Sequence, residues 1–271
     1  MKGAGVVTVL IVAGGVWRAY GQVVFSVGKG PAYEPWKNWR SASNAGSLSL
    51  VRAAILSASP HNTQPWRFKV TNSWIELYLD PNRNVGALDP YLREEHIGMG
   101  CALENLMLAA AANGYAATVT LVPGKRAPIA DGKSKLVARV DLVPGKPEAS
   151  ELYEAIPRRH TNRGAYNPQM AIPAPFLESL GSLPGEEATA KIFLFTAEPQ
   201  RTKIAEISSA ANSELYSDPQ VQDGSDQWIR ADWKFRTEIS RRADHRCLWL
   251  AAYGHGRCQD HAAFDAQATR S

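Results

Sequence analysis

Residues 59–66 read Ser59-Pro60-His61-Asn62-Thr63-Gln64-Pro65-Trp66 and are the most informative stretch of this chain. They follow an apolar helical pattern directly and show neither the period of a helix nor that of a strand. The two prolines fix φ and remove backbone donors, so the loop has few accessible conformations. Asn62 and Gln64 each offer two donors and one acceptor. A stiff loop that presents amides in this way is suited to binding a planar heterocycle.

The composition describes a chain with a sizeable core and no strong charge. Of its 271 residues 45% are apolar, with 8 Trp, 9 Tyr and 7 Phe, enough for one large domain or two small ones. The net charge of +4 comes from scattered basic residues, which does not favour nucleic acid as a partner. The three Cys form neither a disulfide framework nor a C-x-x-C metal pair, and we expect no metal. Cys101 is predicted to pack as a small hydrophobe.

The periodicity predicts a mixed α+β fold. Helices are expected at 48–56, 95–113, 151–158, 176–180 and 199–216, and strands at 67–70, 74–79, 117–122, 136–142 and 192–196. The helix at 95–113 is apolar on nearly every side, which predicts a buried position in the core or in a dimer-like interface, and Asn113-Gly114 should end it. The strands 117–122 and 136–142 should form an antiparallel pair.

Both ends of the chain have unusual patterns. Val6 to Val16 is apolar and Gly-rich, lies between Lys2 and Arg18, and is too short for a membrane span, so residues 1–26 resemble a signal or anchor segment. A twin-arginine-like leader would imply export or membrane association. The alternative is a buried N-terminal helix or strand in a cytoplasmic protein.

Residues 235–271 form an atypical tail that lacks clear periodicity. Two of the three Cys and three of the six His lie after residue 244. Two interpretations stay open, a natural end of this composition or an altered reading frame near residue 234.

A second motif is the basic segment, residues 158–163, which reads Arg158-Arg159-His160-Thr161-Asn162-Arg163. Guanidinium groups bind phosphate oxygens in a bidentate manner, and Thr adds a donor. The segment is therefore a candidate phosphate clamp, and the alternative is a solvated basic turn.

Residues 59–66 resemble the S-x-x-N-x-Q-P-W loop of FMN-dependent nitroreductases, and Arg159–Arg163 is similar to the segment that binds the FMN phosphate in that family. In the family this segment precedes the loop, whereas here it follows about a hundred residues later. This order resembles the divergent Acg-like branch, in which two halves are fused. The Asp80–Arg83 turn and Arg93-Glu94 also resemble that branch.

The resemblance implies a three-layer α+β fold in which two fused halves form an intramolecular pseudo-dimer. The halves would be residues 27–145 and 146–234, the second one incomplete if the reading frame is altered. Because the second half holds no copy of the S-x-x-N-x-Q-P-W loop, we expect one FMN per chain, and a monomer. Trp66 is expected in the core rather than stacked on the flavin.

The resemblance also implies the site and the reaction. The residues predicted to hold the flavin are Ser59, Pro60, Asn62, Gln64, Arg159, His160, Thr161 and Arg163. The chemistry would take place on the flavin, with no catalytic side chain. NAD(P)H would reduce FMN, which would pass electrons to a nitroaromatic or quinone-like acceptor. The alternatives are a protein that binds or sequesters FMN without turnover, and a non-functional product of an altered reading frame.

Overall fold

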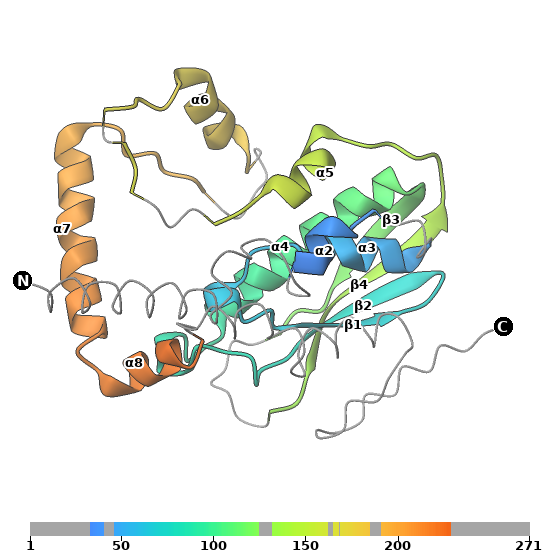
Figure 1. The fold of residues 1–271 in the computed structure, drawn as a ribbon, viewed down its shortest axis with the longest axis horizontal. Helices are drawn as coiled ribbons and strands as arrows, with labels where there is room; N and C mark the ends of the chain where they lie inside the picture. Colours follow the sequence, from blue (N-terminus) through green and yellow to red (C-terminus); the bar gives the residue numbers. More distant parts are fainter. Residues whose placement is uncertain are drawn as a thin grey trace, which may run out of the picture. The chain divides into compact units, whose positions relative to one another are not determined.

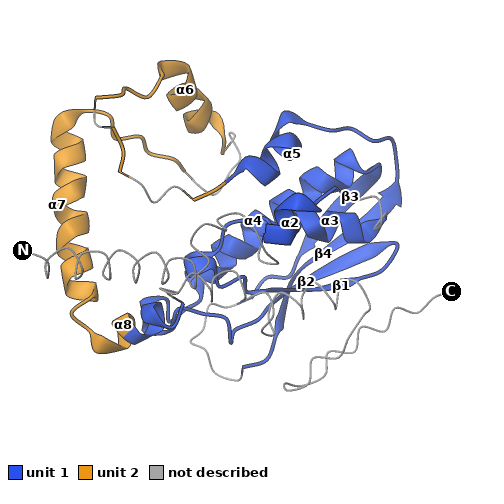
Figure 2. Cartoon of the chain, in the orientation of Figure 1, with its two compact units in different colours: residues 1–159, 223–271 blue, residues 160–222 orange. Residues whose placement is uncertain are grey.

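The computed structural model describes residues 33–40, 46–124, 132–161, 165–167, 169–184 and 191–228. The chain forms two compact units, one of residues 1–159 with 223–271 and one of residues 160–222 (Figure 2). The predicted N-terminal signal or anchor segment and the atypical tail lie outside the described residues. Among the described helices, none is long and apolar enough to cross a membrane. The division into halves at residue 145 stays a prediction.

The first unit is built on a four-stranded antiparallel sheet. Its strands are β1 (Trp66–Val70), β2 (Trp74–Leu79), β3 (Tyr115–Leu121) and β4 (Lys135–Pro144), in the order β1-β2-β4-β3. The predicted strands 67–70, 74–79, 117–122 and 136–142 are thereby confirmed. The predicted antiparallel pairing of the last two is also confirmed, with Val119 opposite Val140.

Helices cover one face of this sheet (Figure 1). Along β2 the side chains of Ile75, Leu77 and Leu79 are buried, while those between them are half-exposed on the other face, as the pleat of a strand requires. The buried face packs on α3 (Ser47–Ala54) and α4 (Arg93–Ala112) in one apolar core. The predicted α+β class is confirmed.

The central helix α4 is buried along one face rather than all round. Its buried residues are Glu95, Gly98, Met99, Ala102, Leu106, Ala109 and Ala110. Ile97 is 62% exposed and Cys101 is also exposed, so the predicted packing of Cys101 as a buried hydrophobe is wrong. A helix beside a single sheet face buries only the stripe turned toward that face. The predicted end at Asn113-Gly114 is confirmed, with Gly114 at φ +79.

Short helical segments complete the first unit. They are α2 (Glu34–Lys37), η4 (Pro60–Asn62), η5 (Gly86–Leu88), α5 (Glu151–Ala155) and η6 (Ile156–Arg158). Ser150 caps α5 by accepting a hydrogen bond from the Tyr153 backbone N–H. Tyr153 and Ile156 then pack into the core, which fixes the chain just before Arg159.

The second unit contains α6 (Ala174–Ser182) and α7 (Glu198–Leu215), and α8 (Pro219–Asp226) ends in the first unit. The strand predicted at Ile192–Thr196 is wrong, because this segment has no regular structure. A strand needs hydrogen-bonded neighbours, and the sheet of the described residues contains β1 to β4 alone. Phe193 is accordingly 72% exposed.

Candidate functional site

The Ser59–Trp66 loop has a backbone that most residues avoid. His61, Asn62 and Gln64 lie in the left-handed region, with φ of 45, 59 and 52. Asn and His tolerate this region better than most residues, yet each such residue costs roughly 1–3 kcal/mol. A conformation of this kind persists only where the surrounding structure fixes it. The contacts of the loop therefore decide which of its side chains are available to a ligand.

Ser59 braces the loop from inside. Its Oγ accepts a hydrogen bond from the Gln64 backbone N–H at 3.0 Å, and its carbonyl accepts one from Asn62 N at 3.1 Å. Thr63 N donates to the Pro60 carbonyl at 2.8 Å. The three backbone donors at the turn are thus used within the loop. Ser59, predicted to contact the flavin, holds the loop shape in this structure.

Gln64 is buried and Asn62 is exposed. The Gln64 side chain donates from Nε2 to Asn62 Oδ1 at 3.2 Å, so the carbonyl end of the Asn62 amide is occupied. The Nδ2 group of Asn62 remains as a two-hydrogen donor at the surface. Among the predicted loop residues, Asn62 is therefore the one presented to a ligand and Gln64 the one that orients it.

The turn at Asp80–Arg83 supports the loop from behind. Arg83 Nε donates to the Thr63 carbonyl at 2.5 Å, and Asp80 N donates to the Pro65 carbonyl at 2.7 Å. The buried Asp80 carboxylate accepts from Arg67 Nε and Nη2 at 2.9 and 2.6 Å. The sequence marked this turn as a motif but gave no sign that it braces the loop.

Two further contacts anchor the loop in the fold. Trp66 is 0% exposed within the core, which confirms the expectation for this residue. On the α4 side, a Cβ at Gly98 would lie 3.4 Å from the Ser59 Cα and from the Pro60 Cδ. A methyl group at position 98 would therefore touch the loop at the short limit of van der Waals contact. A glycine inside a helical pattern was the available sequence signal for this contact.

Arg159 contacts the chain three residues before the loop. Its Nη2 donates to the Leu56 carbonyl at 3.2 Å, although the two residues are 103 positions apart. Leu56 follows the end of α3, where a cation is electrostatically favourable. The structure therefore brings one residue of the basic segment into contact with Leu56, which precedes Ser59 by three residues in the sequence.

The structure describes the other residues of the basic segment only in part. Arg158, His160 and Thr161 are exposed, and the last two belong to the second unit. Arg163 lies outside the described residues. The assembly of a complete phosphate clamp stays a prediction.

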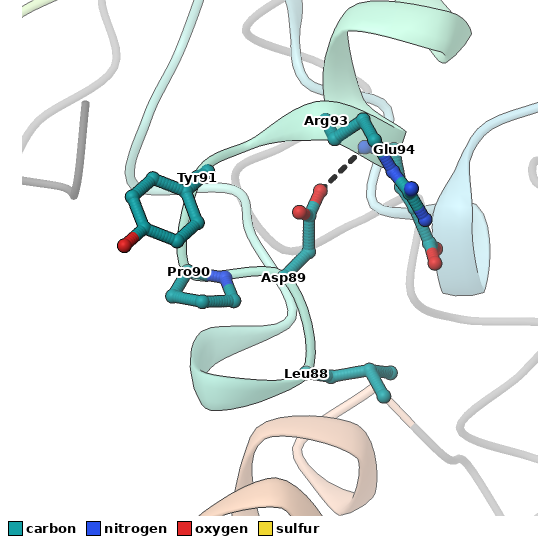
Figure 3. Close-up of a pocket in the computed structure, with 6 residues that line it drawn as sticks. All are labelled: Leu88, Asp89, Pro90, Tyr91, Arg93 and Glu94. Atoms are coloured by element: carbon teal, nitrogen blue, oxygen red, sulfur yellow. Dashed lines mark hydrogen bonds between the residues drawn. The ribbon is translucent and has the colours of Figure 1, made fainter. Parts of the chain in front are cut away.

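A carboxyl pair at the start of α4 was not predicted. The Asp89 carboxylate accepts from the Glu94 backbone N–H at 2.5 Å, as Figure 3 shows. Burial first, and then the adjacent Asp89 carboxylate, raise the pKa of Glu95 to about 8. Burial works to raise the pKa of Asp89, but the Glu95 side chain and the backbone N–H groups of α4 outweigh it and lower that pKa. Glu95 is thus protonated at neutral pH beside an ionised Asp89.

An open depression of about 480 Å³ lies over this end of α4. Its lining residues are Leu88, Asp89, Pro90, Tyr91, Arg93 and Glu94 (Figure 3). No residue of the predicted flavin site lines it. Arg93 and Glu94, marked as a motif in the sequence, belong to this depression.

The S-x-x-N-x-Q-P-W loop of this α+β chain resembles that of nitroreductases. The chain is 33% identical over 143 residues to "Putative NAD(P)H nitroreductase Rv3131" of Mycobacterium tuberculosis, which is 52% of this chain and 39% of that protein. It is 36% identical over 81 residues to "Putative NAD(P)H nitroreductase acg" of the same organism, which is 30% of this chain and 24% of that protein.

These similarities confirm the resemblance inferred from the two motifs: the chain is a homologue of proteins named as nitroreductases, Acg among them. The chain spans about two fifths of the length of the first of these relatives, since 39% of that protein is covered. No family model matches the chain.

Proposed function

We propose that this chain binds FMN between the Ser59–Trp66 loop and the basic segment and acts as an NAD(P)H-dependent oxidoreductase. The acceptor would be a nitroaromatic or quinone-like molecule. The observation that supports this proposal most is the hydrogen bond from Arg159 to Leu56, three residues before a loop that presents the Asn62 amide. The names of the two relatives support the same reaction class.

The donor chemistry of the described residues fits a flavin nucleotide. Asn62 offers two N–H donors of the kind that bind carbonyl and ring-nitrogen acceptors. Arg159 uses one nitrogen on the Leu56 carbonyl and keeps further N–H groups for a phosphate. Pro60, His160, Thr161 and Arg163 would complete the site. When bound, FMN would supply the electron and hydride transfer, and the protein would bind and orient it.

We also propose that the full architecture is the three-layer pseudo-dimer, with one FMN per chain and a monomer in solution. The fusion order of loop and basic segment supports this arrangement. The contact between Arg159 and Leu56 supports it as well, because a residue after position 145 contacts the first half three residues before the loop.

Two spectra test the function. The purified chain, reconstituted with FMN, should show flavin absorbance at roughly 450 nm, a band that belongs to the cofactor itself. Anaerobic NADPH should then bleach this band. A chain that takes up no flavin refutes the proposal. A flavin that dithionite reduces but NADPH and NADH do not would show a protein that binds FMN without turnover.

A variant pair tests the site. Arg159→Ala should weaken FMN binding because a charge-assisted hydrogen bond is worth roughly 1.5–3 kcal/mol, or about ten- to a hundredfold in Kd. Arg158→Ala, at an exposed neighbour, is the matched control and should change Kd by less than about threefold. Fluorescence titration of FMN gives both constants. Equal Kd values for the two variants would refute the assignment of Arg159.

A further inference from the structure

The last described residues of the chain pack against the Ser59–Trp66 loop from behind. We name residues 224–228 the C-terminal latch; they belong to the same compact unit as the loop. Ser225 is 4% exposed, and its Oγ lies 3.0 Å from His61 Nε2. His61 is one of the residues held in the left-handed region. The latch therefore contacts the loop at one of its residues in the left-handed region.

Gly224 sets the position of the latch. A Cβ at this residue would lie 2.3 Å from the Val85 carbonyl oxygen and 3.3 Å from the Gly86 Cα. Gly86 has φ +60, and a Cβ there would lie 3.2 Å from the Gly224 Cα. The end of α8 and the start of η5 thus meet backbone to backbone, and Figure 1 shows these two elements side by side. Only glycine permits this approach.

Trp228 forms a second connection to the loop. Its Nε1 donates to the Asn84 carbonyl at 2.8 Å, and its ring lies 5.5 Å from the Arg83 guanidinium carbon. A cation at this distance from an indole ring is attracted to it. Arg83 in turn donates to the Thr63 carbonyl. A chain of contacts therefore runs from Trp228 through Arg83 to Thr63.

We propose that Gly224, Ser225 and Trp228 are positioning residues that hold the Ser59–Trp66 loop in the conformation that presents Asn62. The latch acts through His61 and Arg83 and does not touch the ligand. Two connections end on either side of Asn62, at His61 and at Thr63. The consequence for a ligand rests on the proposed function, whereas the effect on the loop does not.

Hydrogen exchange tests the latch without any ligand. In the full chain, Ser225→Ala should raise the exchange rates of the Asn62, Thr63 and Gln64 amides by about tenfold, because the loop opens more often. The matched control is Ser217→Ala, since the Ser217 Oγ, just after the end of α7, donates to the Glu214 carbonyl and not to the loop. This control should leave the loop amides unchanged.

Three further variants separate positioning from simple loss of stability. Ser225→Thr keeps the hydroxyl and should restore slow exchange. Gly224→Ala should open the loop more than Ser225→Ala does, with Gly100→Ala as its control, because a Cβ at Gly100 meets nothing within 4 Å. If Gly224→Ala does not fold, the comparison of loop exchange between Ser225→Ala and Ser225→Thr tests the proposal.

The ligand measurement separates this proposal from the proposed function. If the wild type binds FMN, Ser225→Ala should raise its Kd about fivefold and Ser225→Thr should not. Unchanged loop exchange in Ser225→Ala overturns the latch whatever happens to FMN. Fast loop exchange in Ser225→Ala, together with no FMN binding by the wild type, supports the latch and refutes the flavin site.

Discussion

The Ser59–Trp66 loop and the basic segment 158–163 differ in how firmly contacts within the chain hold their conformation when no ligand is bound. The loop uses its own backbone donors, is braced by Asp80 and Arg83, and ends in the core at Trp66. In the basic segment the described residues are exposed, and the side chain of Arg159 rests on one carbonyl. A ligand would find the loop already ordered, whereas it would have to restrict the rotamers of the arginines.

The largest expected difference between the two regions is in the free energy of unfolding that is lost when an aromatic side chain is removed. Trp66→Ala should lower the free energy of unfolding by roughly 3–5 kcal/mol, because it leaves a cavity in the core. The matched change near the basic segment is Tyr166→Ala, three residues after it, where the side chain is 79% exposed; it should cost less than about 0.5 kcal/mol. Urea denaturation measures both. Similar losses would contradict the comparison.

Sequence patterns predicted the parts of the fold that local chemistry controls. The strand at 74–79 was predicted with its observed bounds, and the end of α4 at Asn113-Gly114 follows from local capping. The predicted strand at Ile192–Thr196 failed because strand formation depends on partners elsewhere in the chain.

The sequence marked the residues of the candidate site, but it did not indicate which contacts each of them makes in the fold. The amides of Asn62 and Gln64 were marked from the sequence, yet only the fold shows that Gln64 is buried and orients Asn62. Ser59 bonds Gln64 within the loop, and Ser225 reaches His61 from 164 positions away. Pairings over such distances leave no periodic signal in a sequence.

The carboxyl pair at the start of α4 gives the next largest effect. The pKa of Glu95 is raised from 4.5 to about 8, so its neutral form stabilises the folded state fully below pH 4.5. Stability should fall as the pH rises from about 4.5 to 8, by on the order of 1 kcal/mol per pH unit. Asp89 has a lowered pKa, so its protonation changes the free energy of unfolding only at acidic pH.

Glu95→Gln should remove this decline, since an amide does not ionise. Urea denaturation at several pH values between 5 and 8 measures it. A wild type whose stability is flat over this range would rule out the neutral Glu95.

The brace behind the loop should have a smaller effect. Asp80→Ala leaves the partly buried Arg67 guanidinium without its acceptor and should cost roughly 1–3 kcal/mol. Asp141→Ala is the control, because its ion pair with Arg139 lies on the half-exposed sheet face and is worth less than about 1 kcal/mol. Thermal unfolding compares the two. A larger loss of thermal stability in Asp141→Ala than in Asp80→Ala would contradict the stabilising role of the Asp80–Arg67 pair.

The smallest expected effect concerns two glycines of α4. Gly100→Ala should stabilise the chain by up to about 1 kcal/mol through helix propensity. Gly98→Ala should gain less, because its Cβ would lie 3.4 Å from Ser59 and Pro60, at the short limit of van der Waals contact. The shift in Tm measures the difference. Equal shifts would mean that the loop yields easily and is less firmly held than its contacts indicate.

The hairpin of β1 and β2 has a consequence for the order of folding. Its turn closes at Thr71, whose N–H donates to the Trp74 carbonyl, and its last rung pairs Trp66 with Leu79. A hairpin zips from its turn because short loops close first. We therefore expect the Ser59–Trp66 loop to form late, after that last rung. In pulse-labelling exchange during refolding, the Asn62 amide should gain protection after Phe68, and the reverse order would contradict this. A chain that presents Asn62 would then be one that has finished forming the β1–β2 hairpin.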